Sequence, residues 1–190
     1  MGSFYDLKSD IIMHMIYKRI IILGGSGSGK STLANRISLY TGYPIYHLDN
    51  ILLNSDWSQK EKSEWLNICK KEFLSKDTGV IDGNYSSVLN ERIDWADLII
   101  FINVPTLRHL FNILKRSAMV NLGLEKRHGM EKGRKDTVNL KFFKWVLNWN
   151  RGHKKKMFTI LESIKDKRVV ITNTPIKLNI DELLNEEIGK

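Results

Sequence analysis

The sequence predicts a three-layer α/β fold in which a five-stranded parallel sheet lies between helices. Apolar, strand-like runs alternate along the chain with segments of helical periodicity, a pattern typical of a parallel sheet covered on both faces. The pattern GxxxxGK[ST] is met in full at residues 24–31, between an apolar run and a helix-like run. Because the chain has 190 residues, of which 42% are hydrophobic, we expect one domain with a substantial core.

The stretch at residues 19–32 reads Arg-Ile-Ile-Ile-Leu-Gly-Gly-Ser-Gly-Ser-Gly-Lys-Ser-Thr. Its glycines allow successive amide N–H groups to surround a phosphate at the start of a helix. Lys30 would add a positive charge at the β- and γ-phosphates, and the Ser31 hydroxyl would be a ligand of Mg²⁺. The predicted nucleotide-binding residues of this loop are Gly24, Gly25, Ser26, Gly27, Ser28, Gly29, Lys30, Ser31 and Thr32.

The alternative interpretation of this stretch is a Gly/Ser turn that happens to precede a lysine. The apolar run before it and the helical spacing of Leu33, Ala34, Ile37 and Tyr40 after it favour the phosphate loop. The dinucleotide fingerprint GxGxxG is not met, so a nucleoside triphosphate is preferred to NAD. The sequence leaves the choice between ATP and GTP open.

The chain before and after this loop divides into short elements. We expect residues 1–14 to be a frayed extension, with Met15 as a possible natural start. Residues 43–49 predict a second strand that ends in Asp49, followed by a loop at residues 50–57. Residues 58–61, Ser-Gln-Lys-Glu, have the form of a capping box. The helix after it would bury one face made of Trp65, Cys69 and Phe73, with Cys69 as a structural thiol.

Three more strands are predicted at residues 78–85, 97–104 and 168–174, and a polar helix follows the last of them. Between the fourth and fifth strands the pattern is helical. The apolar positions of the first helix are Leu107, Leu110, Phe111 and Leu114, and those of the second are Phe142, Phe143, Val146 and Trp149. A basic segment with glycines at 123, 129 and 133 separates these helices, and we expect a lid at about residues 117–140.

Two carboxylates and several arginines are candidate site residues. Asp82 at the end of the third strand is the expected partner of Mg²⁺. Asp49 would hold the acceptor or act as its base, and a helix cap or surface carboxylate is the alternative. Arg116, Arg127 and Arg134 would neutralise charge on a transferred phosphoryl group, and a solvated basic surface is the alternative. The five histidines have no metal-ligand spacing.

The positive charge of the chain is concentrated in one region. The net charge is +9, yet residues 105–168 carry 17 Lys and Arg against 5 Asp and Glu. Such a region suits either the phosphates of a small substrate or those of nucleic acid. No apolar stretch is long enough to span a bilayer and no signal peptide is evident, so a cytoplasmic location without a membrane partner is expected.

Several runs together resemble the FlaR-type DNA topology modulation proteins, an adenylate-kinase-related branch of the P-loop kinases. They are the phosphate loop, Tyr-His-Leu-Asp-Asn at 46–50, Asp-Trp at 56–57, Ile-Asp-Gly-Asn-Tyr-Ser at 81–86 and Arg-Ile-Asp-Trp-Ala-Asp-Leu-Ile-Ile at 92–100. The resemblance extends over about residues 16–156 and implies strand order 2-3-1-4-5, ATP on the loop and a lid over the phosphates. The positions that match the family pattern are Asp49, Asp82, Arg116, Arg127 and Arg151.

The lid departs from this family pattern. Relatives tend to have Arg-Pro-Asp-Met followed by Glu-Gly-Cys-Pro, whereas this chain has Arg-His-Gly-Met at 127–130 and Glu-Lys-Gly-Arg at 131–134. The motifs predict an ATP- and Mg²⁺-dependent kinase of a small acceptor, such as a nucleoside monophosphate. The resemblance further implies that Arg151 binds the nucleotide. The alternative is a nucleotide-regulated DNA-binding protein that uses residues 105–168, although no helix-turn-helix or zinc-finger signature is present. The oligomeric state cannot be inferred.

Overall fold

The computed structural model describes residues 16–54, 58–122 and 146–185. Five strands form one parallel sheet of order β2-β3-β1-β4-β5, as the family resemblance implies. They are β1 (Arg19–Gly24), β2 (Ile45–His47), β3 (Gly79–Asp82), β4 (Leu98–Ile102) and β5 (Arg168–Thr172). The predicted extension at residues 1–14 lies outside the described ranges. The strand carrying the phosphate loop, β1, is therefore central in the sheet.

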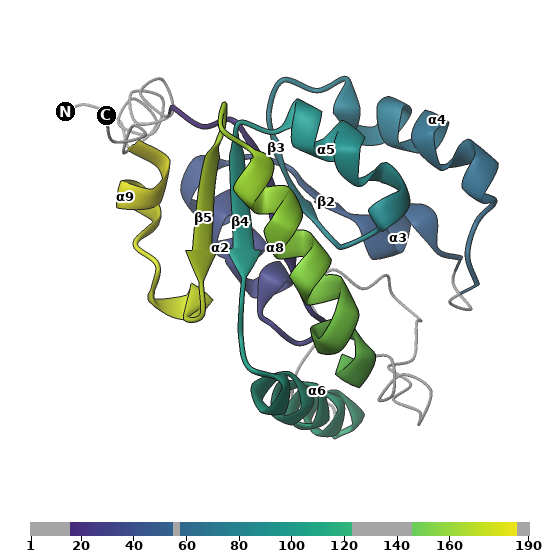
Figure 1. Cartoon of the computed structure of the whole chain (residues 1–190), viewed down its shortest axis with the longest axis vertical. Helices are drawn as coiled ribbons and strands as arrows, with labels where there is room; N and C mark the ends of the chain where they lie inside the picture. Colours follow the sequence, from purple (N-terminus) through teal and green to yellow (C-terminus); the bar gives the residue numbers. More distant parts are fainter. Residues whose placement is uncertain (1–15, 55–57, 123–145, 186–190) are drawn as a thin grey trace.

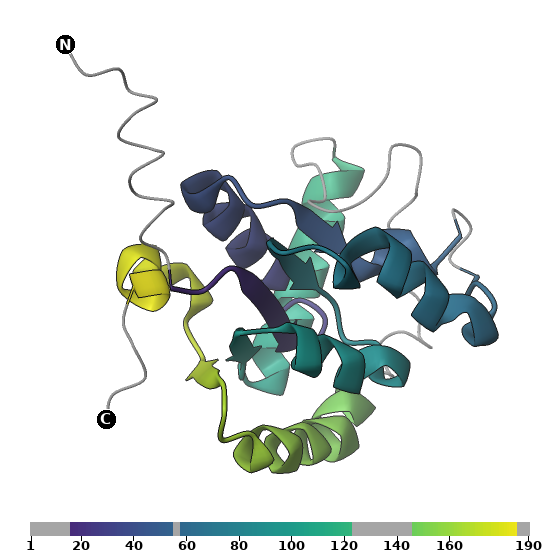
Figure 2. The ribbon, with the colours of Figure 1, turned by 90° about the horizontal axis from the view of Figure 1, so that it is seen from above.

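Helices cover both faces of the sheet (Figures 1 and 2). The helices within the described ranges are α2 (Lys30–Thr41), α3 (Leu48–Leu52), α4 (Trp65–Cys69), α5 (Leu89–Trp95), α6 (Thr106–Asn121), α8 (Lys154–Ser163) and α9 (Ile180–Asn185). Short 3-10 or π turns are η1 (Lys62–Glu64), η2 (Lys70–Leu74), η3 (Ser86–Val88), η4 (Trp149–His153) and η5 (Pro175–Lys177). Within the described part of the chain, no helix has the length and apolarity needed to cross a membrane.

Each face of the sheet has its own apolar core. Successive side chains of a strand point to opposite faces. Ile20 and Ile22 of β1 therefore pack with α2 and α9, whereas Ile21 and Leu23 pack with α4, α5 and α8. None of these four side chains has any exposed surface. A continuous apolar run without alternation is the signature of such a doubly covered strand.

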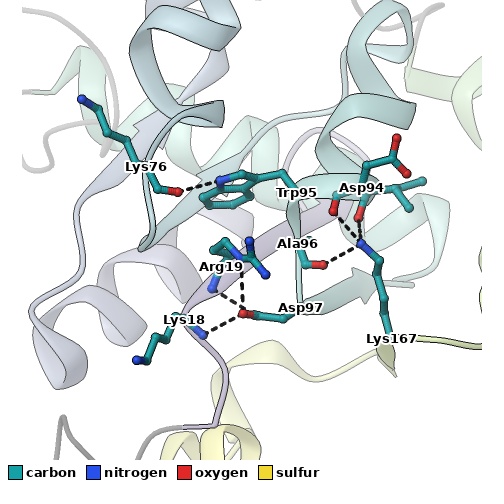
Figure 3. A network of polar contacts seen from close by, with 9 residues as sticks. Lys18, Arg19, Lys76, Asp94, Trp95, Ala96, Asp97 and Lys167 are labelled. Atoms are coloured by element: carbon teal, nitrogen blue, oxygen red, sulfur yellow. Dashed lines mark hydrogen bonds and ion pairs between the residues drawn. The ribbon is translucent and has the colours of Figure 1, made fainter.

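Polar contacts join several elements at the amino ends of the strands (Figure 3). The ammonium group of Lys167 donates hydrogen bonds to three main-chain carbonyl oxygens at and just after the end of α5, at 2.6 to 2.9 Å. It thereby satisfies carbonyls that a helix C-terminus leaves without partners. The carboxylate of Asp97 accepts hydrogen bonds from the main-chain N–H groups of Lys18 and Arg19. These contacts fix the starts of β1, β4 and β5 relative to α5.

The predicted boundary of the second strand is wrong. β2 ends at His47, and Asp49 lies in the first turn of α3 instead of at a strand end. Leu48 and Leu52 lie one helical turn apart and are both fully buried, so coiling here gains apolar burial that an extended chain would lose. Residues 50–52, predicted as loop, are helical for the same reason.

The predicted capping box at residues 58–61 is also wrong. The helical segment begins at Lys62, and Glu61 at its N-cap makes no side-chain hydrogen bond. The hydroxyl of Ser58 instead accepts a hydrogen bond from the side chain of Asn54 at 2.9 Å. The predicted apolar face is confirmed and consists of the buried residues Trp65, Cys69 and Phe73.

Helix α6 lies beyond the carboxyl ends of the central strands (Figure 1). The predicted helix is confirmed, but its apolar residues Leu107, Phe111 and Leu114 are 80%, 65% and 52% exposed. The buried side of α6 carries His109 and Ile113, which pack on the phosphate loop. Residues 117–121 of the predicted lid belong to this helix. Residues 123–140 of that prediction lie outside the described ranges.

Candidate functional site

The loop between β1 and α2 has the backbone that a phosphate site needs. Gly29 has a φ of +98°, in the left-handed region that side chains disfavour, and this conformation lets α2 begin at Lys30. Among the described residues no side chain caps the first turn of α2, and that turn has no acidic residue. Its amide N–H groups therefore remain as donors at the positive end of the helix.

Lys30 reaches back across this loop. Its ammonium group donates a hydrogen bond to the carbonyl oxygen of Gly25 at 3.0 Å, and the N–H of Ser28 donates to the same oxygen at 3.2 Å. The nine predicted nucleotide-binding residues at 24–32 thus run from the last residue of β1 through the loop into the first turn of α2. Thr32 is exposed, whereas Gly24, Gly25 and Ser28 are buried.

Asp82 and Ser31 meet beside the loop. Ser31 Oγ donates a hydrogen bond to Asp82 Oδ2 at 2.5 Å, and Nδ1 of His47 lies 3.2 Å from the same oxygen. The register of the sheet explains this arrangement, because Asp82 pairs with Ile22 of β1 on one side and with His47 of β2 on the other. Three elements far apart in the sequence therefore converge on one carboxylate.

The Asp82 carboxylate is buried but charged. Burial by itself raises its pKa, yet His47, Lys30 and Ser31 together hold the pKa below its ordinary value. Oδ1 of Asp82 is also buried and has no hydrogen-bond partner among the described residues. A carboxylate oxygen in this situation suits a water molecule or a cation, and hydroxyl and carboxylate oxygens are the ligands that Mg²⁺ prefers. Ser31 and Asp82 fit a magnesium ion.

The segment after β3 holds the start of the phosphate loop. The side-chain carbonyl of Asn84 accepts a hydrogen bond from the N–H of Gly24 at 3.0 Å, and its amide group donates to the carbonyl oxygen of Gly24. Arg92 of α5 is fully buried and donates to the carbonyl oxygens of Gly83, Tyr85 and Val88 at 2.7, 2.9 and 3.2 Å. The segment that carries Asn84 is thus anchored by one guanidinium group.

Helix α6 supports the loop from the other side. Nδ1 of His109 donates a hydrogen bond to the carbonyl oxygen of Ser26 at 2.8 Å, and the side-chain amide of Asn112 donates to the carbonyl oxygen of Gly27 at 2.8 Å. A Cβ atom on Gly25 would lie 2.6 Å from the imidazole of His109, so only glycine fits there. Burial lowers the pKa of His109, which favours the neutral imidazole.

Asp49 lies on the opposite side of Asp82 from the loop, just beyond the end of β2. Its carboxylate accepts a hydrogen bond from the hydroxyl of Tyr85 at 3.0 Å, and both residues are half-buried. The Tyr85 ring packs edge-on against Trp65, with ring centroids 5.4 Å apart. The carboxylate of this α3 residue is therefore bonded to the segment after β3, whose Tyr85 in turn packs against Trp65 of α4.

Two of the four predicted arginines lie within the described residues. Arg116 is half-buried on α6, one turn beyond Asn112 and on the same side of the helix. Arg151 lies in η4. Arg127 and Arg134 lie outside the described residues. The structure thus brings Lys30, Ser31 and Asp82 together and leaves the roles of the arginines as predictions.

The contacts that are not predicted from the sequence include those of His47, Asn84, Arg92 and His109. For His47 and His109 the sequence indicates only that they lack metal-ligand spacing. Asn84 and Arg92 fall within the runs that carry the family resemblance, and this is the one signal that pointed to them. Their partners lie up to 83 residues away in the sequence, so local patterns do not reveal them.

The sheet order, the loop after central strand β1 and the Ser31–Asp82 contact define the fold. It is the three-layer α/β fold of the P-loop NTPases. No protein-family model matches the sequence, and no curated protein matches it.

The solved structures similar to this chain include two kinases. One is a gluconokinase from Sinorhizobium meliloti 1021, with 16% sequence identity, a TM-score of 0.42, and coverage of 77% of this chain and 98% of that one. The other is a deoxyadenosine kinase from M. mycoides with bound dATP, with 15% identity, a TM-score of 0.45, and coverage of 86% and 94%. Because these values are low, the function is inferred from the site itself.

Proposed function

We propose that the chain is an ATP- and Mg²⁺-dependent phosphotransferase that moves the γ-phosphoryl group of ATP to a small acceptor. The observation that carries the proposal is the 2.5 Å contact between Ser31 and Asp82 at the base of the phosphate loop. Such a hydroxyl and carboxylate beside a loop lysine are the partners that a nucleotide-bound magnesium ion requires. Open parallel sheets bind ligands at this edge, beyond the carboxyl ends of their strands.

Different residues of the chain bind the phosphates and the metal. The amide N–H groups of the loop and the ammonium of Lys30 bind the phosphates and stabilise the charge that spreads over the transferred group. Ser31 and Asp82 hold Mg²⁺, which when bound neutralises charge on the β- and γ-phosphates. The Asn84 and His109 contacts to the loop keep its donors oriented before the nucleotide arrives.

Asp49 and the arginines complete the proposed site. Asp49 faces the acceptor hydroxyl and accepts its proton. Arg116, Arg127 and Arg134 stabilise the transferred phosphoryl group, and Arg151 contacts the nucleotide. Arg116 is supported by its place beyond Asn112 on the buried side of α6.

The direct test is ADP release from Mg·ATP over a panel of acceptors, together with nucleotide binding by calorimetry. Lys30→Ala should lower turnover by on the order of 10³ or more, because a full charge at the transferring phosphate is removed. The melting temperature should change little, since Lys30 contributes charge rather than packing. Lys71→Ala on exposed η2 is the matched control and should behave like the wild type. Wild-type turnover in a normally folded Lys30→Ala variant would contradict the proposal.

A DNA-binding function is the second candidate, supported by the 17 basic and 5 acidic residues at 105–168. It requires phosphate contacts along a duplex and hence a steep salt dependence. We rank it second because the contacts of Ser31, Asp82 and Lys30 have no purpose in backbone binding alone.

A further inference from the structure

The Asp82 carboxylate is held by donors from two different elements. Ser31 Oγ and His47 Nδ1 both contact Oδ2 of this carboxylate, at 2.5 and 3.2 Å. Ser31 lies in the first turn of α2, whereas His47 is the last residue of β2, which neighbours β3 in the sheet. A carboxylate only accepts hydrogen bonds, so Nδ1 of His47 carries the hydrogen in this contact.

A single hydrogen bond would leave this carboxylate able to turn. The torsion about the Cβ–Cγ bond of an aspartate has a broad energy minimum, so one donor on one oxygen does not fix the plane of the group. A second donor from another element restricts this rotation. The orientation of the second oxygen, Oδ1 of Asp82, therefore depends on His47 as well as on Ser31.

The packing just beyond the two strands keeps His47 beside Asp82. These two residues pair directly in the parallel register of β2 and β3. The residues that follow them are also in close contact, because a Cβ atom on Gly83 would lie 2.7 Å from the Cβ atom of Leu48. Gly83 has a φ of +144°, which side chains disfavour, and Leu48 is fully buried. The main chain thus fixes where the imidazole meets the carboxylate.

We propose that His47 is a positioning residue for Mg²⁺, whose Nδ1–H orients the Asp82 carboxylate so that Oδ1 is available to the ion or to its bound water. This proposal rests on the phosphotransferase function proposed above. His47 acts through Asp82 and is not itself a ligand. Hydrogen bonds from outer residues to metal ligands typically contribute about 10- to 100-fold to metal affinity.

Two amide variants test which ring nitrogen matters. His47→Asn keeps an N–H donor at the δ position, where Nδ1 contacts Asp82, whereas His47→Gln moves the donor to the ε position. Both variants replace the imidazole by an uncharged amide, so each is the control for the other. Only His47→Asn retains a donor that can orient the carboxylate.

Calorimetry with a non-hydrolysable ATP analogue over a Mg²⁺ series gives the Mg²⁺ concentration for half-maximal binding. We expect His47→Gln to raise this concentration about tenfold or more, and His47→Asn to leave it near the wild-type value. In EDTA, both variants should bind the analogue as the wild type does, because the donors of the phosphate loop are unaltered. Urea denaturation without nucleotide and Mg²⁺ should give the two variants similar stability.

A measurement on the wild-type protein tests the hydrogen position directly. Long-range ¹H–¹⁵N NMR spectra show which ring nitrogen of an assigned histidine carries a hydrogen. We expect a hydrogen on Nδ1 of His47. A bare Nδ1 would overturn the proposal, even if neither variant folded.

The remaining outcomes also decide the matter. Wild-type Mg²⁺ dependence in His47→Gln, or an equal shift in both variants, overturns the role of the δ donor alone. A loss of analogue affinity that is the same with and without Mg²⁺ overturns it too, because such a loss indicates a structural effect on the loop. Analogue binding by the wild type that depends on neither Lys30 nor Mg²⁺ overturns the proposed function beneath it.

Discussion

At the residue scale, Asp82 is the carboxylate that we propose to bind Mg²⁺. Asp82→Asn keeps the shape of the side chain and its place beside Ser31 but removes the charge. We expect the Mg²⁺ concentration for half-maximal turnover to rise about 10- to 100-fold, with ATP binding without magnesium nearly unchanged. Turnover and calorimetry over a magnesium titration measure both. Superimposable titrations for the variant and the wild type would make Asp82 a purely structural residue.

Cys69 reports on the apolar core that α4, α5 and α8 form with the sheet. It is fully buried, and burial raises the pKa of its thiol to about 11 from 9.0. The unfolded chain therefore releases this proton near pH 9, whereas the folded protein keeps it until about pH 11. Because the folded state binds the extra proton in this window, its stability falls as pH rises from 9 to 11.

This sign gives a measurable prediction for Cys69. The urea midpoint of the wild type should fall between pH 9 and 11 more steeply than that of Cys69→Ala. The thiol should also be unreactive to a disulfide reagent at pH 8 until denaturant is added. Rapid labelling of the native protein would show that the thiol is accessible and that this account of the core is wrong.

At the scale of elements, α5 holds the segment after β3 through Arg92. Burial lowers the pKa of this guanidinium to about 10, so it stays protonated at neutral pH. Arg92→Met keeps an unbranched side chain but removes the guanidinium donor from the carbonyl oxygens of Gly83, Tyr85 and Val88, of which Tyr85 O keeps the N–H of Val88 at 3.4 Å. At about 1–3 kcal/mol for each group left unsatisfied, the free energy of unfolding should fall by about 2 kcal/mol or more.

The same variant should weaken the site, because Asn84 lies in the segment that Arg92 anchors. Urea denaturation gives the stability, and calorimetry under native conditions gives the ATP affinity. Arg92→Lys keeps a positive charge and one donor group, so its stability and its ATP affinity should fall less than those of Arg92→Met. A loss below about 1 kcal/mol in Arg92→Met would mean that water or relaxation satisfies the three carbonyls.

At the scale of the whole molecule, the basic region at residues 105–168 distinguishes the two candidate functions, because each function uses its positive charge differently. Replacing Arg127 and Arg134 together by alanine removes two positive charges from the basic region, in residues that the structure does not describe. For a kinase, we expect turnover to fall strongly, by about 10³-fold for a fully engaged arginine, with little effect on duplex DNA. ADP release and a salt series with a DNA duplex measure the two activities on one protein.

The DNA-binding alternative predicts the reverse for this double variant. The affinity for duplex DNA would fall. In a plot of the logarithm of the binding constant against the logarithm of the salt concentration, the slope would become shallower by up to about two units, one for each lost phosphate contact. Replacing the exposed Lys70 and Lys71 together by alanine removes the same charge and controls for net charge alone. Loss of duplex binding with intact turnover would overturn the preferred function.

The sequence by itself determined the parallel α/β class and the phosphate loop. Ile20–Leu23 are continuously apolar, and residues 24–31 carry the glycines, lysine and serine in one unbroken stretch. Both signals are local, because strand periodicity and loop chemistry depend on neighbours in the chain. The place of Asp82 at the carboxyl end of the third strand was predicted for the same reason, although the strand spans Gly79–Asp82 instead of the predicted residues 78–85.

Tertiary structure alone decided which side chains surround that loop. His47 and Ser31 reach Asp82 only because β2 and α2 are brought to it by the sheet register and the first helix. Asp49 lies in a helix because Leu48 and Leu52 are buried by elements distant in sequence. His109 and Asn112 meet the loop because α6 packs its less apolar side inward. A sequence pattern records the polarity of each residue, whereas its partner depends on which elements pack together, and that is a property of the whole fold.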